Sequence, residues 1–302
     1  MTNAEPRIQA PSGVLTTPTT RTSATFKTLR RFVLRKPLGA FGAGIVLVLF
    51  LVALFAPLVA PHDPNESIRG ARLVAPTWSH IMGTDNLGRD LFSRPVYGAR
   101  ISLIVGLGAS VVGIVSGVAL GLVSGYLGGK VDEIMQRIID SMMAFPGLIL
   151  ALALVAMLGP SIRNVLIAIA LGSIPNTTRV VRGAVLSVKQ EDYVQASRSL
   201  GATGFRIAVS HLLPNIMAPV LILASVMFGT AIIAEASLSF LGLGIQPPTP
   251  SWGAMLSGPS RRFMTTAPWM AIFPGLAISI VIFGINIFGD ALRDVLDPRL
   301  RG

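Results

Sequence analysis

Two histidines and three aspartates in one segment of this sequence could be arranged into a metal site. His62 and His80 share one segment with Asp63, Asp85 and Asp90, and zinc accepts both imidazole and carboxylate ligands. Their spacing contains no repeated i, i+4 pair, which is how one helix face presents two ligands. We therefore expect these groups to pair with one another structurally, and we assign no metal site.

A Gly-Gly-Lys sequence at 128–130 is a candidate for a phosphate-binding loop. That motif requires a glycine where Ser124 stands and Ser or Thr where Val131 stands, so the match fails. The sequence contains no His-Glu-x-x-His, no Gly-x-Ser-x-Gly and no cysteine. We therefore assign no catalytic residue and no cofactor to this chain. If its function requires ATP, the nucleotide must bind to a partner protein.

A charged, helix-forming segment at 187–215 lies between two apolar segments. Ser187 with Gln190 forms a capping-box pattern, which satisfies free amides at the start of a helix. Glu191 and Asp192 place negative charge at the positive end of that helix dipole. The sequence therefore predicts that a new helix begins near Ser187.

This helix also has a predicted end. Gly201 can take the left-handed conformation that follows a helix, because glycine has no Cβ to clash. Thr203 can then cap a second short helix that runs to Pro214. Together these signals predict a helical hairpin at 187–213 that lies outside the bilayer.

The composition places these segments in a membrane protein. The chain has 302 residues, of which 52% are hydrophobic and only 13% charged, and its mean hydropathy is +0.68. A span needs about 20 apolar residues. We predict an all-α integral membrane protein with six transmembrane helices, at about 39–60, 101–125, 142–159, 163–181, 216–238 and 269–289. Polar residues 176–179 interrupt the fourth span and must face protein or water.

Positive charge predicts the orientation. With an inside N-terminus, 17 of the 25 Lys and Arg residues fall on the inner side, so both termini and the hairpin are expected in the cytoplasm. The net charge of +11 is spread over loops, which favours a lipid anchor over nucleic-acid binding. The expected segments are a disordered cytoplasmic tail at 1–25, an amphipathic segment with the first span at 26–60, an extracytoplasmic loop at 61–100, a core at 101–291 and a cytoplasmic C-terminal tail at 292–302.

The hairpin carries a specific motif. Gln195-Ala196-Ser197, Gly201 and the run from His211 to Pro214 resemble the Glu-Ala-Ala loop of permease subunits in binding-protein-dependent ABC importers. In that family the loop is the coupling helix, which sits in a groove of the cytoplasmic ATPase. Gln195 replaces the usual Glu and Ser197 the usual second Ala, so the docking shape should survive although the negative charge of the usual Glu is absent. The resemblance implies these ATPase-coupling residues: Glu191, Tyr193, Gln195, Ala196, Ser197, Leu200, Gly201, Ala202, His211 and Pro214.

Further motifs extend the resemblance over about residues 30–301. They fall at 80–94, 97–103, 125–132, 235–244 and 289–299, and they are similar to the dipeptide and oligopeptide branch, in the C-type subunit with a short first loop. Pro95 departs from the aliphatic residue usual at its position.

The resemblance implies an ABC importer type I permease fold in the bacterial inner membrane. It also implies a second homologous permease subunit, an extracytoplasmic solute-binding protein and two cytoplasmic ATPase subunits, which would bind the ATP and Mg. The implied function is ATP-driven uptake of dipeptides or oligopeptides, with ATP hydrolysis on the partners and not on this chain. Branches that import nickel, glutathione or another small solute share this pattern and remain alternatives.

Three polar residues within or near the spans are candidates for the pathway or its gate: Asn176, Glu235 and Asn286. An ionisable side chain at membrane depth is a functional candidate, but Glu235 is better explained by hydrogen bonds to Ser237 or Ser239. Asn286 is better explained as a bridge between helices. For His211 we favour a packing or interface role over proton relay.

Two other classes of protein fit the sequence less well. A self-contained secondary transporter usually carries a midplane carboxylate relay or broken helices in repeated halves, and the sequence shows neither. A membrane-embedded enzyme needs converging ligands or a nucleophile with its base inside the spans, and no such motif is present.

Overall fold

The computed structural model describes residues 36–296. The chain divides at Pro37 into two units, and the helical bundle belongs to the unit that begins at Leu38. The predicted tail at 1–25, residues 26–35 of the amphipathic segment and residues 297–302 of the predicted C-terminal tail lie outside the described residues. Within the described range the chain is helical and contains one isolated β-bridge, between Thr84 and Asp90.

The helices follow one another in this order: α2 (Pro37–Leu54), α3 (Ala56–Val59), α4 (Ser93–Leu127), α5 (Gly129–Met143), α6 (Gly147–Leu158), α7 (Ile162–Val188), α8 (Asp192–Ser199), α9 (Gly204–Ile207), the π-helical segment η1 (Ala208–Leu212), α10 (Leu213–Asn215), α11 (Met217–Phe240), α12 (Trp252–Leu256), α13 (Pro259–Arg262) and α14 (Trp269–Leu296). Five of them, α2, α4, α7, α11 and α14, are each long and apolar enough to cross a membrane. The pair α5 and α6 passes the same test only when both are taken as one broken span. The described residues therefore hold five spans, or six with the broken one.

The third span differs from its prediction. A single helix was expected at 142–159, but α6 has only 12 residues and α5 precedes it at an angle of 84°. The break falls at Ala144–Pro146 because proline cannot continue a helix and also pushes Phe145 out of helical geometry. The amphipathic α5 and the apolar α6 therefore form either a broken span or a re-entrant loop.

The fourth span, α7, is the most buried of the candidate spans. Half of the residues in its most apolar stretch lie inside the protein. Its hydroxyls turn back onto their own helix: Thr178 Oγ1 donates to the carbonyl of Ile174 at 2.8 Å and Thr177 Oγ1 to that of Ser173 at 3.2 Å. Both threonines are fully buried in protein. The prediction that the polar groups of this span face protein is confirmed for these two residues.

Helices α4 and α7 pack closely because α4 presents glycines to α7. A Cβ at Gly117 would lie 2.5 Å from Thr177 Cβ, and a Cβ at Gly121 would lie 2.7 Å from Val181 Cβ. No side chain fits at these positions without moving α7. The glycines of α4 therefore serve close approach between the two helices.

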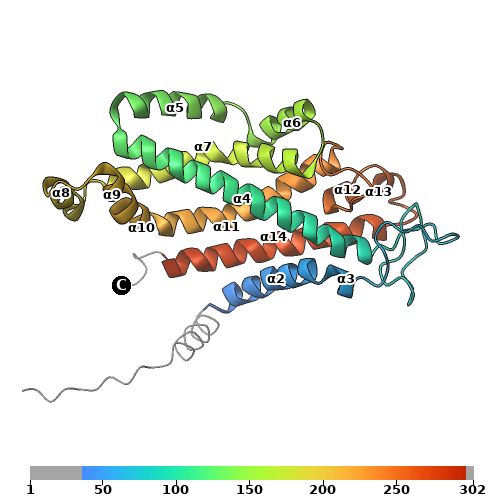
Figure 1. Ribbon diagram of the computed structural model, residues 1–302. Coiled ribbons are helices and arrows are strands. Elements are labelled where there is room, and N and C mark those ends of the chain that lie inside the picture. The colour runs from blue at the N-terminus through green and yellow to red at the C-terminus, as the bar shows by residue number, and fades with distance from the viewer. Residues whose placement is uncertain (1–35, 297–302) are drawn as a thin grey trace, which may run out of the picture. The chain divides into compact units, whose positions relative to one another are not determined.

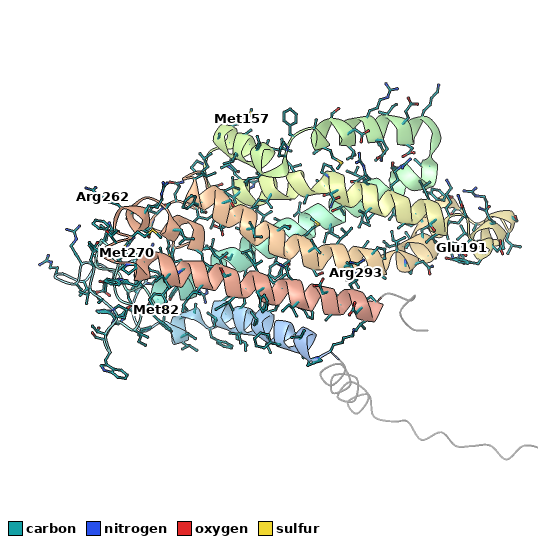
Figure 2. The ribbon with its side chains drawn as sticks, turned by 180° about the vertical axis from the view of Figure 1, so that it is seen from behind. Met82, Met157, Glu191, Arg262, Met270 and Arg293 are labelled. Atoms are coloured by element: carbon teal, nitrogen blue, oxygen red, sulfur yellow. The ribbon has the colours of Figure 1, made fainter. Side chains whose placement is uncertain are left out.

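Figure 1 shows α4, α7, α11 and α14 lying along one another, with helices α8 to α10 at one end and the loop at 60–92 with α12 and α13 at the other. The C-terminal end of α14 lies toward the end that carries α8. Figure 2 places Glu191 at that end, and Met82, Arg262 and Met270 at the opposite end. The bundle therefore separates a hairpin end from a loop end.

Candidate functional site

The hairpin forms as predicted at its turn. Gly201 has φ +81°, and its amide donates to Arg198 O at 3.0 Å while the amide of Ala202 donates to Ser197 O at 3.1 Å. This is the paired-bond pattern of a Schellman motif. Thr203 Oγ1 accepts from the amide of Arg206 at 3.4 Å, so the predicted cap of the second helix is confirmed.

The start of the hairpin was predicted wrongly. Ser187 lies in the last turn of α7, and α8 begins only at Asp192, with Glu191 as an N-cap that makes no side-chain bond. Helix α7 continues past the predicted boundary because Val181 and Val185 are buried against the hairpin. Tertiary burial of an apolar face stabilises a helix more than local capping signals do.

Gln195 has a role that the motif did not indicate. Its Nε2 donates to the backbone carbonyl of Lys189 at 2.9 Å, and Lys189 is the residue that ends α7. The side chain thus satisfies a carbonyl that α7 leaves free and ties α8 to the end of that helix.

The inner face of the hairpin is a hydrophobic core shared with the spans. Val194 from α8 and Ile207 from α9 are buried together with Leu212, and this cluster continues into α7 and α11. The cluster comprises Val181, Val185, Val194, Ile207, Leu212, Ile216 and Val220. Packed side chains therefore connect α8 to two spans, α7 and α11.

The hairpin carries two large apolar side chains that the described residues leave uncovered. Leu200 is 88% exposed and Phe205 is 81% exposed. Most of the predicted coupling residues are also exposed: Glu191, Tyr193, Gln195, Ala196, Gly201 and Pro214. Sequence reasoning missed Phe205, although an apolar residue two positions after the Thr203 cap was visible in the sequence.

Three predicted coupling residues are partly covered: Ser197, Ala202 and His211. His211 Nε2 lies 3.2 Å from Ser197 Oγ, and its ring lies 6.1 Å from that of Tyr193. These contacts join η1 to α8. The predicted packing or interface role of His211 is compatible with this position.

Charged side chains connect the hairpin end to α4 and α5. Lys189 Nζ donates to the carbonyl of Tyr126 at 2.6 Å, and Arg198 stands 5.9 Å from the ring centre of Tyr126. Asp132 in α5 accepts two bonds from Arg182 in α7, at 2.6 and 2.5 Å. Sequence analysis did not single out this pair, because 50 residues separate its members.

The three candidate pathway residues do not converge. Asn176 lines a cavity of about 390 Å³ between α4, α6, α7 and α11, whose polar lining otherwise consists of Ser110, Ser173, Thr230 and Ser237. Asn286 lines a different cavity of about 340 Å³ between α11 and α14, and its Oδ1 lies 3.5 Å from where a Cβ on Gly229 would stand.

Glu235 faces protein. It is fully buried, and Ser239 Oγ donates to its Oε1 at 2.8 Å. Ser102 Oγ lies 3.5 Å from its Oε2, while Ser237 bonds to a backbone carbonyl instead. The expected hydrogen bond from Ser239 is confirmed.

At the loop end, carboxylates pair with a guanidinium and with an imidazole. Arg89 Nε lies 2.6 Å from Asp85 Oδ2, and Arg94 Nη1 donates to Pro64 O at 2.7 Å. His80 Nδ1 lies 3.1 Å from Asp90 Oδ1. These contacts fold the loop back onto the start of α4.

Comparison with known proteins finds two matching family models and several similar permease proteins. The family described as binding-protein-dependent transport system inner membrane component matches residues 117–302, and the N-terminal TM domain of oligopeptide transport permease C matches residues 26–76. The dipeptide transport system permease protein DppC of Alkalihalophilus pseudofirmus is 45% identical over 91% of this chain and 89% of its own length. The di/tripeptide transport system permease protein DppC of Pseudomonas aeruginosa is 45% identical over 87% and 89%.

Other similar proteins carry different names. The glutathione transport system permease protein GsiD of Pectobacterium atrosepticum is 44% identical over 90% of each chain. A chain from the inward-facing MetNI methionine ABC transporter superposes with a TM-score of 0.57 at 17% identity, covering 68% of this chain and 98% of that one. This last likeness shows a shared fold.

Proposed function

Because the chain belongs to the family of inner membrane components of binding-protein-dependent transport systems, we propose that it forms half of the membrane pathway of an ATP-driven importer of dipeptides or oligopeptides. It is a multi-pass protein of the bacterial inner membrane with a permease fold. Relatives named for dipeptide and di/tripeptide transport support the substrate class. Relatives named for glutathione transport keep a small-solute substrate as the alternative.

The observation that carries the proposal is the hairpin, with an exposed apolar tip on a buried base. Leu200 and Phe205 offer a partner two large exposed apolar side chains to cover. We take this partner to be the ATPase that supplies the energy, with ATP and Mg bound there. Two ATPases, one for each permease, would then hold the pair of hairpins.

Movement of the ATPases would reach the pathway through rigid elements. Val194 and Ile207 bind the hairpin to the ends of α7 and α11, and the pair Asp132–Arg182 connects α7 with α5. A displacement of α8 is therefore expected to move these spans together, as a rigid-body switch biased by a ligand of the partner.

The pathway itself requires a second subunit. The cavity beside Asn176 has a volume of about 390 Å³ and a lining of apolar and small polar side chains, which is near the lower end for drug-sized ligands. A homologous permease facing this surface would enlarge the cavity, to which this chain contributes no charged side chain. A wide and weakly selective passage suits varied peptides, and the solute-binding protein would set specificity.

The proposed orientation places the hairpin in the cytoplasm. Because the chain has no cysteine, single cysteines at Gln190 and Asn65, both exposed positions, give a clean readout. In intact cells a membrane-impermeant maleimide should label position 65 and leave position 190 unlabelled. After permeabilisation both positions should react, which controls for accessibility. The reverse pattern in intact cells would overturn the orientation and with it the role of the hairpin.

The substrate class is tested by competition. In cells that lack other peptide importers, the complete transporter should take up a labelled dipeptide, and excess unlabelled dipeptide should abolish that uptake. Equal excesses of glutathione or Ni²⁺ should leave most of it. Uptake of labelled glutathione that a dipeptide fails to inhibit would move the assignment to the small-solute alternative.

A further inference from the structure

Three side chains at the loop end meet far from the hairpin. His62 follows α3, His80 lies in the loop, and Asp90 lies just before α4. One ligand atom from each lies within 4.8 Å of the other two. Figure 2 shows Met82, two residues beyond His80, at the opposite end of the bundle from Glu191. The cluster therefore belongs to neither the hairpin nor the cavity beside Asn176.

Both imidazoles turn the same nitrogen toward one carboxylate. His80 Nδ1 lies 3.1 Å from Asp90 Oδ1, and His62 Nδ1 lies 3.8 Å from Asp90 Oδ2. The distance from His62 is too long for a hydrogen bond. Among the described residues His62 Nδ1 is the buried side-chain nitrogen that finds no hydrogen-bond partner. A buried polar atom without a partner is costly, so its position calls for an explanation.

Asp90 is held in place from the other side. It is almost fully buried, and its Oδ2 accepts hydrogen bonds from Ser93 N at 2.8 Å and Ser93 Oγ at 2.7 Å. Such bonds fix a carboxylate in the way that outer partners orient the ligands of metal sites. Oδ1 stays directed toward His80.

We propose that His62, His80 and Asp90 bind one divalent transition-metal ion of the zinc class. Zinc binds imidazole nitrogen and carboxylate oxygen at about 2.0–2.2 Å, which places tetrahedral ligands roughly 3.3 Å apart. The nitrogen-to-oxygen distances, 3.1 Å from His80 to Oδ1 and 3.8 Å from His62 to Oδ2, each lie within about 0.5 Å of that value. The three ligand atoms lie within 4.8 Å of one another, so a small rotation of the two imidazole rings would bring them to the spacing of a zinc site, with a water molecule as the fourth ligand.

The ligand set also indicates which ions would not compete. Ca²⁺ and Mg²⁺ prefer oxygen ligands, and two imidazoles out of three are unsuited to them. The sequence contains no cysteine, so softer thiolate chemistry plays no part. The bound ion would fasten the residue that follows the first span to the start of α4, and through α4 to α7. This role is independent of the solute that the transporter carries.

The test measures metal on the full chain purified with a tag that contains no histidine and then stripped with a chelator. Equilibrium dialysis should give one Zn²⁺ per chain, and Co²⁺ should produce visible absorption typical of a tetrahedral nitrogen and oxygen site. His62→Gln and His80→Gln should each weaken binding by more than about tenfold, because changes to outer-shell partners alone cost about 10–100-fold. Glu66→Gln, an exposed carboxylate of the same loop, and His211→Gln should bind as the unaltered chain does.

Thermal unfolding of each variant separates loss of a ligand from loss of the fold. Zn²⁺ should raise the unfolding temperature of the unaltered chain and leave that of the His62→Gln/His80→Gln double variant unchanged. If the unaltered chain binds no more Zn²⁺ than the folded double variant does, the cluster is a hydrogen-bonded pairing only and the proposal fails. Equal loss of binding in His211→Gln would also overturn it.

Discussion

Proteoliposomes that contain this chain alone should accumulate no peptide and hydrolyse no ATP. The segment Gly128–Lys130 is the nearest approach to a phosphate-binding loop, and in the structure it comprises Gly128, which separates α4 from α5, and the first two residues of α5. Ser124, which stands where that loop needs its first glycine, donates a hydrogen bond to the carboxylate of Asp132. A carboxylate at this position repels phosphate, so the turn is unsuited to a nucleotide.

Addition of the second permease, both ATPases and the binding protein should restore uptake from background to a clearly measurable rate. Replacement of the catalytic glutamate of the ATPases by glutamine should remove uptake again and leave the assembled complex intact, which is the matched control. Peptide uptake by the isolated chain under a proton gradient would instead support a secondary transporter. ATP hydrolysis by the isolated chain would contradict the assignment of the energy source.

Substitution of Gly201 by valine should uncouple the transporter. The conformation at φ +81° is strained for a β-branched residue, and such strain costs about 1–3 kcal/mol. No atom lies within 4 Å of a Cβ at this position, so the effect would come from the backbone and not from a clash. Relief of the strain would turn Leu200 and Phe205 away from the ATPase. We expect the purified Gly201→Val complex to lose most of its bound ATPase and its substrate-stimulated hydrolysis.

Gly201→Asn is the matched control for this variant. Asparagine adopts the left-handed conformation more readily than other residues with a side chain, and the open space around Gly201 accommodates it. Coupling should therefore largely survive in Gly201→Asn. Both variants should insert into the membrane in normal amounts, as measured by quantitative blotting. Full transport by Gly201→Val would show that the geometry of the hairpin is not needed for coupling.

Several signals that depend on neighbours in sequence were read correctly. Runs of apolar residues identified the spans, because insertion into a bilayer depends on the composition of about 20 consecutive residues. Gly201 and Thr203 were recognised because the end of a helix is decided within a few residues. The motifs around Gln195 indicated the family for the same reason.

The tertiary structure decided what depends on contacts between distant segments. Ser187 and Gln190 form a plausible cap, yet burial of Val185 against the hairpin extends α7 through Ser187. The third span bends at Ala144–Pro146. Hydropathy averaged along a whole span does not reveal such a bend. At Ser187 the packing of neighbouring segments overrules the local pattern, whereas the bend at Ala144–Pro146 follows from the proline itself.

Side-chain clusters show the same division between sequence and tertiary structure. The sequence placed His62, His80 and Asp90 in one loop, and Asp132 and Arg182 at the edges of different spans. The two members of the ion pair lie 50 residues apart along the chain. Spacing in the sequence therefore does not show which of these groups come into contact. Only the packing of the loop onto α4 and of α5 onto α7 brings them within bonding distance. The sequence by itself therefore determined the membrane class, the family and the local turns, whereas the tertiary structure decided which charged and ligating groups meet, because such meetings depend on how the helices pack.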